Sequence, residues 1–198
     1  MWKPVDTEFS VPRCPVSVVN VSGWGTEFIR AMLEALNCVV VVHHIGTPAD
    51  FIKVIEQGEN APRYMIIMGH GTKDGLHFGD YGVPVDTSML HNDLMPPEAI
   101  CEHTKLPGCT VFSFSCYGGN KAMAEAFLAG DVSAYIGCRT GPDTTAMALF
   151  LFHFLFGVLS KQLPDHDAWH RAVAATDHED IYQFSFFHAD GAEERFGE

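Results

Sequence analysis

The sequence predicts an α/β fold, a three-layer α/β/α sandwich around a mostly parallel sheet of about six strands. Short, β-branched apolar runs alternate with helical patterns along most of the chain. Turns rich in glycine or proline separate the two kinds of segment. Strands that alternate with helices form parallel sheets whose two faces are both covered.

The first part of the chain repeats a unit of strand, turn and helix. We expect strands at residues 16–21, 38–43 and 64–68, and helices at residues 26–37 and 47–57. The first strand ends in the turn Ser22-Gly23-Trp24-Gly25, and Thr47-Pro48-Ala49-Asp50 carries the cap residues of a helix start.

After the third strand the pattern changes. Residues 72–82 indicate a small hairpin or protruding loop, and a short helix is expected around residues 88–94. Further strands are expected at residues 109–114, 134–137 and 182–187, and helices at residues 121–129, 144–162 and 165–176. The polar tail from residue 189 onward is expected to fray.

The longest apolar segment, residues 147–159, is shorter than the roughly 20 residues that cross a bilayer. It follows Pro142-Asp143-Thr144-Thr145, which offers turn and N-cap chemistry. We therefore expect a buried helix and no membrane association.

Length and charge limit the possible functions. A chain of 198 residues is long enough for one core, so residues 1–198 are expected to form a single domain. Twelve Lys and Arg against 25 Asp and Glu give a net charge of −13, which argues against nucleic-acid binding and favours basic partners. Residues 1–6 do not resemble the start of a secretory signal, so a cytoplasmic location is expected.

The six cysteines lack any C-x-x-C pair, which argues against a zinc knuckle or a thioredoxin-type site. Most of them are expected to be reduced core residues, and no cofactor or metal is predicted. Cys116 differs from the others because it follows a predicted strand and precedes Gly118 and Gly119.

His70-Gly71 and Cys116 follow two strands that we expect to be neighbours. Reactive groups collect at the carboxyl ends of parallel strands, and a nearby imidazole or a helix N-terminus favours the thiolate. The N–H groups of Gly71 and Cys116 would form an oxyanion hole, with each donor worth roughly 3 to 4 kcal/mol of barrier.

These residues carry a resemblance to a known family. A hydrophobic block that ends in His70-Gly71, and a second that ends in Ser115-Cys116 with Gly119 beyond it, resemble the caspase-like cysteine peptidases. This group includes caspases, gingipains, legumain, separase and the CHAT domains. Residues 76–82, 134–137, 146–159 and 167–172 look most like CHAT domains.

The resemblance implies a role for each residue of the dyad. Cys116 would be the nucleophile, His70 would protonate the leaving amine, and Gly71 with Cys116 would supply the oxyanion donors. The resemblance requires no third triad member and implies a protein or peptide substrate.

The resemblance also implies a substrate pocket at Ser22, Phe114 and Arg139. The chain departs from the family here, because caspases that select Asp have arginine at the place of Ser22, and metacaspases have an acid at the place of Phe114. Neither preference can be carried over. Three acids expected in loops near the same sheet edge are candidates to receive Lys or Arg: Asp74, Asp131 and Asp143.

Two other functions stay open. The segment Cys116-Tyr117-Gly118-Gly119 is similar to the nucleophile elbow of dienelactone-hydrolase-like enzymes, which act on ester substrates, although Phe114 stands where the elbow needs a small residue. This alternative needs a later Asp and His, and the candidate histidines after the fifth expected strand are His166, His170, His178 and His188. The other alternative is a caspase-like interaction domain without turnover.

His166 and His170 lie one helical turn apart beside Asp167, a spacing that could bind a metal. No further ligand is evident in the sequence, so a solvated helix face is the preferred interpretation. The overall prediction is a cysteine endopeptidase that cleaves a restricted protein substrate, with its oligomeric state open.

Overall fold

The computed structural model describes residues 13–23 and 25–196. Trp24 and residues 1–6, on which the expectation about a secretory signal rests, lie outside them. A seven-stranded sheet has the order β10-β9-β8-β7-β3-β1-β2, so β10 and β2 are its edges. Its strands are β1 (Cys14–Asn20), β2 (Cys38–His44), β3 (Tyr64–Met68), β7 (Thr110–Phe114), β8 (Ala134–Cys138), β9 (Phe184–His188) and β10 (Glu193–Arg195). In this sheet β2, β1, β3, β7 and β8 pair in parallel, whereas β9 pairs antiparallel with both β8 and β10.

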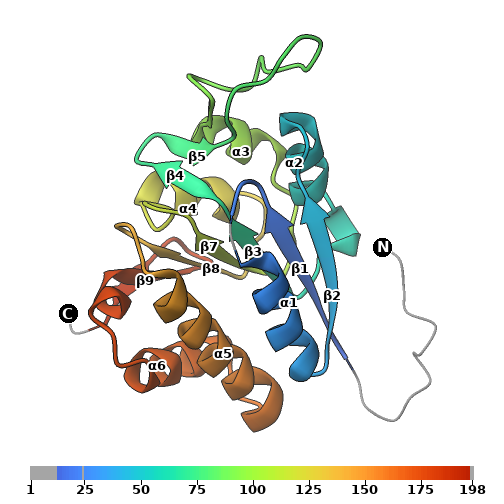
Figure 1. Ribbon diagram of the computed structural model, residues 1–198. Coiled ribbons are helices and arrows are strands. Elements are labelled where there is room, and N and C mark those ends of the chain that lie inside the picture. The colour runs from blue at the N-terminus through green and yellow to red at the C-terminus, as the bar shows by residue number, and fades with distance from the viewer. Residues whose placement is uncertain (1–12, 24, 197–198) are drawn as a thin grey trace.

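Helices cover both faces of this sheet (Figure 1). They are α1 (Thr26–Ala35), α2 (Pro48–Ile55), α3 (Pro97–His103), α4 (Lys121–Leu128), α5 (Thr144–Lys161) and α6 (Asp165–Ala175), with 3-10 turns η1 (Gly58–Asn60) and η2 (Glu179–Gln183). Helices α1, α5 and α6 share one apolar core with the sheet, and α2, α3 and α4 share the other. The three-layer fold expected from the sequence is confirmed, with one strand more than the six predicted.

The long apolar helix α5 packs one side into the first core. Its Phe154 ring lies 4.9 Å from the Phe112 ring of β7 and 6.1 Å from the Tyr64 ring of β3, edge to face in both cases. Within the described part of the chain, α5 is the one helix that is long and apolar enough to cross a membrane by those criteria alone. Its buried side chains identify it as a core helix, as expected.

A second sheet of three short strands projects from the carboxyl end of β3. It consists of β4 (His70–Thr72), β5 (Gly75–His77) and β6 (Leu94–Met95), all antiparallel. Residues 78–93 form the long loop at the top of Figure 1. The hairpin or protruding loop expected at residues 72–82 is therefore present in part, as a hairpin at residues 70–77 followed by a long loop.

The helix expected around residues 88–94 is wrong. Asn92 and Asp93 have positive φ angles of 50° and 63°, which a right-handed helix cannot contain, and His91 forms a β-bridge with Leu94. The helix in this region is instead α3, which begins at Pro97 after Pro96. Proline is well tolerated at a first helical position because its missing N–H would have no intrahelical partner there.

The expectation of a frayed tail is also wrong up to Arg195. Asp190 and Gly191 form a tight turn in which the Gly191 N–H donates to the His188 carbonyl at 2.8 Å. Gly191 has a φ of 84°, and β10 then pairs with β9. The expected edge strand at residues 182–187 is therefore an interior strand.

Candidate active site

His70 and Cys116 occupy equivalent places beyond two neighbouring strands. Met68 of β3 pairs with Phe114 of β7, and His70 and Cys116 each lie two residues farther along their chains. Both residues therefore lie at the carboxyl edge of the parallel strands. The expectation that these two strands are neighbours is confirmed.

The segments that carry the two residues are in close backbone contact. A Cβ atom placed on Gly71 would lie 2.6 Å from the Cys116 carbonyl oxygen and 3.1 Å from the Ser115 Cβ. Real Cβ atoms do not approach so closely, so only glycine fits this position without a shift of the backbone. The structure thus brings Gly71 and Cys116 together. His70 is exposed and Cys116 is half-buried.

The turn after Cys116 is held by hydrogen bonds from several elements. Tyr117 has a φ of 59°, and its N–H donates to the Thr140 carbonyl at 2.8 Å. The Asn120 side chain accepts from the Met123 N–H and donates to the Tyr117 carbonyl, both at 2.8 Å. Asn120 therefore caps α4 and fixes the turn that carries the thiol.

Buried hydroxyl groups below this turn also form hydrogen bonds. The Tyr135 hydroxyl donates to the Gly118 carbonyl at 2.6 Å. The hydroxyl groups of Ser113 and Ser115 lie 3.1 Å apart. Burial raises the pKa of Tyr135, so this hydroxyl remains a neutral donor.

The loop after β8 borders the thiol. A Cβ atom on Gly141 would lie 3.3 Å from the Cys116 Sγ, so this glycine leaves space beside the sulfur. Arg139 begins the same loop, and its guanidinium donates to the Tyr182 carbonyl at 3.3 Å. Its Nε atom is buried and has no hydrogen-bond partner within the described residues.

Ser22 and Phe114, the other two residues expected in a substrate pocket, differ in position. The Ser22 Oγ accepts a hydrogen bond from the His70 N–H at 3.3 Å, so Ser22 lies at the candidate site. Phe114 is only 5% exposed, and its ring packs edge to face against Phe112 and Phe184 in the core. Phe114 therefore packs in the core and does not line an open pocket.

The β4–β5 hairpin also reaches toward the cysteine turn. The Lys73 ammonium lies 5.7 Å from the centroid of the Tyr117 ring, within the range of a cation–π contact. Lys73 and Gly141 were not identified from the sequence, because their role depends on contacts between segments far apart in the chain. In the sequence, the only signal of these contacts was the presence of glycine soon after each strand.

The acids proposed for a basic substrate are not equivalent. Asp131 precedes β8 and therefore lies at the amino edge, opposite Cys116, so its expected position was wrong. Asp143 follows β8, but its carboxylate accepts from the Thr145 and Ala146 N–H groups and caps α5. These hydrogen bonds lower the pKa of Asp143. Asp74 lies exposed at the tip of the β4–β5 hairpin.

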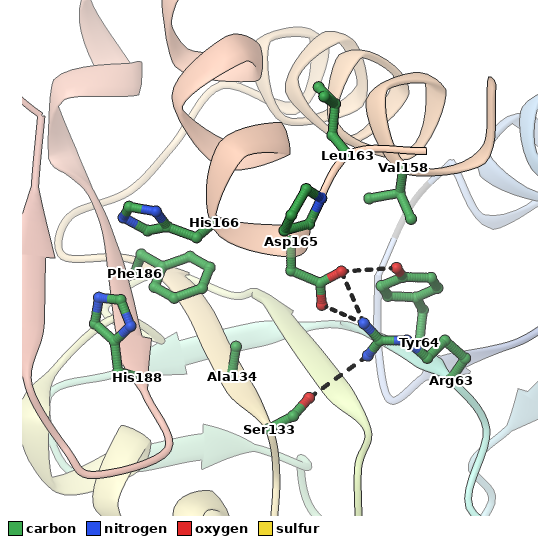
Figure 2. Close-up of a pocket in the computed structure, with 11 residues that line it drawn as sticks. Arg63, Tyr64, Ser133, Ala134, Val158, Leu163, Asp165, His166, Phe186 and His188 are labelled. Carbon is green, nitrogen blue, oxygen red and sulfur yellow. Dashed lines mark hydrogen bonds and ion pairs between the residues drawn. The ribbon is translucent and has the colours of Figure 1, made fainter. Parts of the chain in front are cut away.

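A second polar cluster lines a cavity of about 460 Å³ at the amino edge (Figure 2). Arg63 donates to both oxygens of Asp165, at 2.8 and 2.7 Å. The hydroxyls of Tyr64 and Thr110 donate to the same carboxylate at 2.9 and 2.6 Å. Asp165 is the first residue of α6, so this cluster anchors that helix to the sheet.

The nucleophile-elbow alternative needs a histidine near Cys116 from the last part of the chain. His166, His170 and His188 gather around Glu194, and His188 pairs across the ladder with Ala134, the first residue of β8. They therefore lie at the amino edge, away from Cys116. The ring of His178 accepts from the Asp180 N–H in its own turn.

No protein-family model and no curated protein sequence matches the chain. Several solved structures have a similar fold. The complex of the Porphyromonas gingivalis RgpB pro- and mature domains aligns over 88% of this chain with a TM-score of 0.58 and 11% identity. The Arg-specific cysteine proteinase gingipain R aligns over 84% with a TM-score of 0.53 and 12% identity. An inactive zymogen C11 protease from Parabacteroides distasonis aligns over 91% with a TM-score of 0.51 and 12% identity.

These alignments cover 47%, 43% and 64% of the respective chains, so this chain matches only part of each. At such identities the likeness concerns the fold alone. The chain has the caspase-like α/β fold that these structures share.

Proposed function

We propose that this chain, with its caspase-like fold, is a cysteine endopeptidase that uses Cys116 and His70. The observation that carries the proposal is the register of β3 and β7, which sets the two residues equally far beyond the pair Met68 and Phe114. The thiolate of Cys116 would attack the peptide carbonyl carbon, and the C–N bond would break as His70 protonates the leaving amine. Water would then hydrolyse the thioester and regenerate the thiol.

The backbone supports the same chemistry. Gly71 packs against the Cys116 carbonyl, so the amides of these two residues belong to one small region beside the thiol. Backbone N–H groups in such a position would stabilise the oxyanion of the tetrahedral intermediate. Ser22 accepts a hydrogen bond from the His70 N–H and thereby fixes the start of β4.

The substrate is proposed to be a protein or peptide segment. The similar structures include an Arg-specific cysteine proteinase and a C11 protease zymogen, which favours peptide over ester substrates. Ser22 and the loop that begins at Arg139 would border the substrate. Because Gly141 has no side chain, the substrate could lie beside the Cys116 sulfur. A specific relation to CHAT domains stays a prediction.

Iodoacetamide labelling tests the dyad, because the chain supplies an internal standard. Cys101 is exposed on α3, whereas Cys116 is half-buried. If His70 activates Cys116, peptide mapping will show that Cys116 reacts faster than the more exposed Cys101. His70→Ala should slow labelling of Cys116 at least tenfold and leave Cys101 unchanged.

His77→Ala is the matched control, because His77 faces His70 across the β4–β5 ladder. It should leave Cys116 labelling within about twofold of wild type. Equal reactivity of Cys116 and Cys101 in wild type would refute an activated dyad. A fast thiol with no hydrolysis of a positional peptide library would favour an interaction domain or an ester substrate, and Cys116→Ala provides the blank for that screen.

A further inference from the structure

Three histidines converge on one carboxylate at the amino edge of the sheet. The Nε2 atoms of His166 and His170 lie 2.7 Å and 2.9 Å from different oxygens of Glu194. The same two Nε2 atoms are 3.2 Å apart, and the Nε2 of His188 lies 3.4 Å from Glu194. Each imidazole thus presents its Nε2 atom to the Glu194 carboxylate.

Three elements bring these side chains together. His166 and His170 are four residues apart on α6 and therefore share a face of that helix. Glu194 of β10 pairs directly with Phe186 of β9, and His188 lies two residues beyond Phe186 on the same face of the strand. Figure 2 shows His166 and His188 next to Phe186, and the centroids of the two imidazole rings are 5.3 Å apart.

We propose that this cluster is a zinc site, with His166, His170 and Glu194 as ligands and His188 in the fourth position. In a tetrahedral zinc site with bonds of about 2.1 Å, ligand atoms lie roughly 3.4 Å apart. The first three ligand atoms all lie within 4.8 Å of one another. Small side-chain shifts would open their contacts of 2.7 to 3.2 Å to this spacing.

The surroundings suit such an ion. The four side chains are between 30% and 45% exposed, so an ion can reach them from solvent. The Nδ1 of His166, on the far side of its ring, faces the Asp167 carboxylate at 3.8 Å. Carboxylates commonly occupy this place behind histidine ligands of zinc and orient the ring.

The position of the cluster indicates its role. It lies at the amino edge of the sheet, whereas Cys116 lies at the carboxyl edge, so the ion would not take part in the proposed hydrolysis. It would instead link α6 to β9 and β10, the last strands of the sheet. We therefore expect a structural ion that stabilises the carboxyl-terminal part of the chain.

Calorimetric titration of the full chain with ZnCl2 tests the proposal. One equivalent should bind to wild type, and excess ZnCl2 should raise the melting temperature by several degrees. Loss of a ligand in His170→Ala or Glu194→Gln should weaken binding by more than the ~10- to 100-fold typical of second-shell changes. The melting temperature of these variants should no longer respond to ZnCl2.

Two controls separate this site from others. His44→Ala removes an exposed histidine from β2 and should retain both the stoichiometry and the thermal shift. Cys116→Ala should also retain them, because the proposed ligands do not include the thiol. Absence of binding in wild type, equal binding in His170→Ala and Glu194→Gln, or loss of binding in Cys116→Ala would each overturn the proposal.

Discussion

Gly71 lies where the backbone of β4 touches the segment that carries Cys116. We expect Gly71→Ala to push the β4 segment away from Cys116, because the new methyl would lie 2.6 Å from a carbonyl oxygen. Overpacking of this kind typically costs about 1 to 3 kcal/mol of stability. A shift of about 1 Å at a reacting group can cost ~100-fold in rate.

Chemical denaturation and the rate of Cys116 labelling check this expectation. Gly82→Ala is the matched control, because no heavy atom lies within 4 Å of a Cβ atom at Gly82. Gly82→Ala should leave both quantities near wild type. If Gly71→Ala did the same, the close contact would have no functional weight.

His43, half-buried at the end of β2, should make stability depend on pH. Burial lowers the pKa of His43 below its ordinary value of 6.5. The unfolded chain therefore takes up a proton near pH 6.5 that the folded chain resists, and stability falls as the pH drops below this value.

Replacing His43 with Gln should reduce this loss, because Gln does not titrate and can still bond to the Ser17 hydroxyl, which lies 3.3 Å from the His43 ring. Urea unfolding at pH 7.5 and pH 5.5 measures the difference between the two proteins. His44→Gln, at the exposed neighbouring position, should retain the wild-type pH response. An unchanged response in His43→Gln would exclude His43 as the source.

For single residues, the sequence predicted that His70 and Cys116 follow neighbouring strands, but it predicted the surrounding contacts less well. His70 and Cys116 were identified because each follows an apolar strand and precedes glycine. Glu194 was missed, since it lies 28 residues after His166 and their contact depends on the turn that precedes β10. Phe114 was assigned to a pocket by resemblance, but side chains alternate between the faces of a strand and this ring enters the core.

Among the elements, the cap of α4 joins stability to the proposed chemistry. Asn120→Ala removes the cap and the bond to the Tyr117 carbonyl, so it should cost about 1 kcal/mol and slow Cys116 labelling. Thr47→Ala removes the equivalent cap of α2, where Thr47 accepts from the Asp50 N–H. It should lower stability similarly without changing the labelling rate.

Thermal unfolding and peptide mapping of both variants measure the two effects. Equal labelling rates in Asn120→Ala and Thr47→Ala would show that the cap does not position the thiol.

Elements with strong periodic patterns were predicted within two residues of their ends, whereas weak patterns failed. Helix α3 has only seven residues, too few to show a periodicity. The helix expected around residues 88–94 does not form, because Asn92 and Asp93 have positive φ angles. Strand β10 is polar and lacks apolar alternation. The Asp190-Gly191 pair, a typical hairpin turn, was the signal that could have revealed it.

For the molecule as a whole, Phe154 joins helix and sheet layers. This side chain is fully buried against Tyr64 and Phe112, so Phe154→Ala should cost about 3 to 5 kcal/mol. Phe152 on the same helix is 36% exposed, and Phe152→Ala should cost clearly less. Free energies of unfolding from urea titration compare them, and equal losses would contradict the proposed packing of α5.

The two borders of the main sheet have opposite chemical character. Strand β2 has four consecutive valines and, among the described residues, pairs with a neighbour on one side only. Strand β10 closes the other border with Glu193, Glu194 and Arg195, charged side chains of the kind that discourage further pairing. Lateral growth of the sheet, whether by a second copy or by an extended peptide, is therefore favoured at the valine-rich border and opposed at the acidic one.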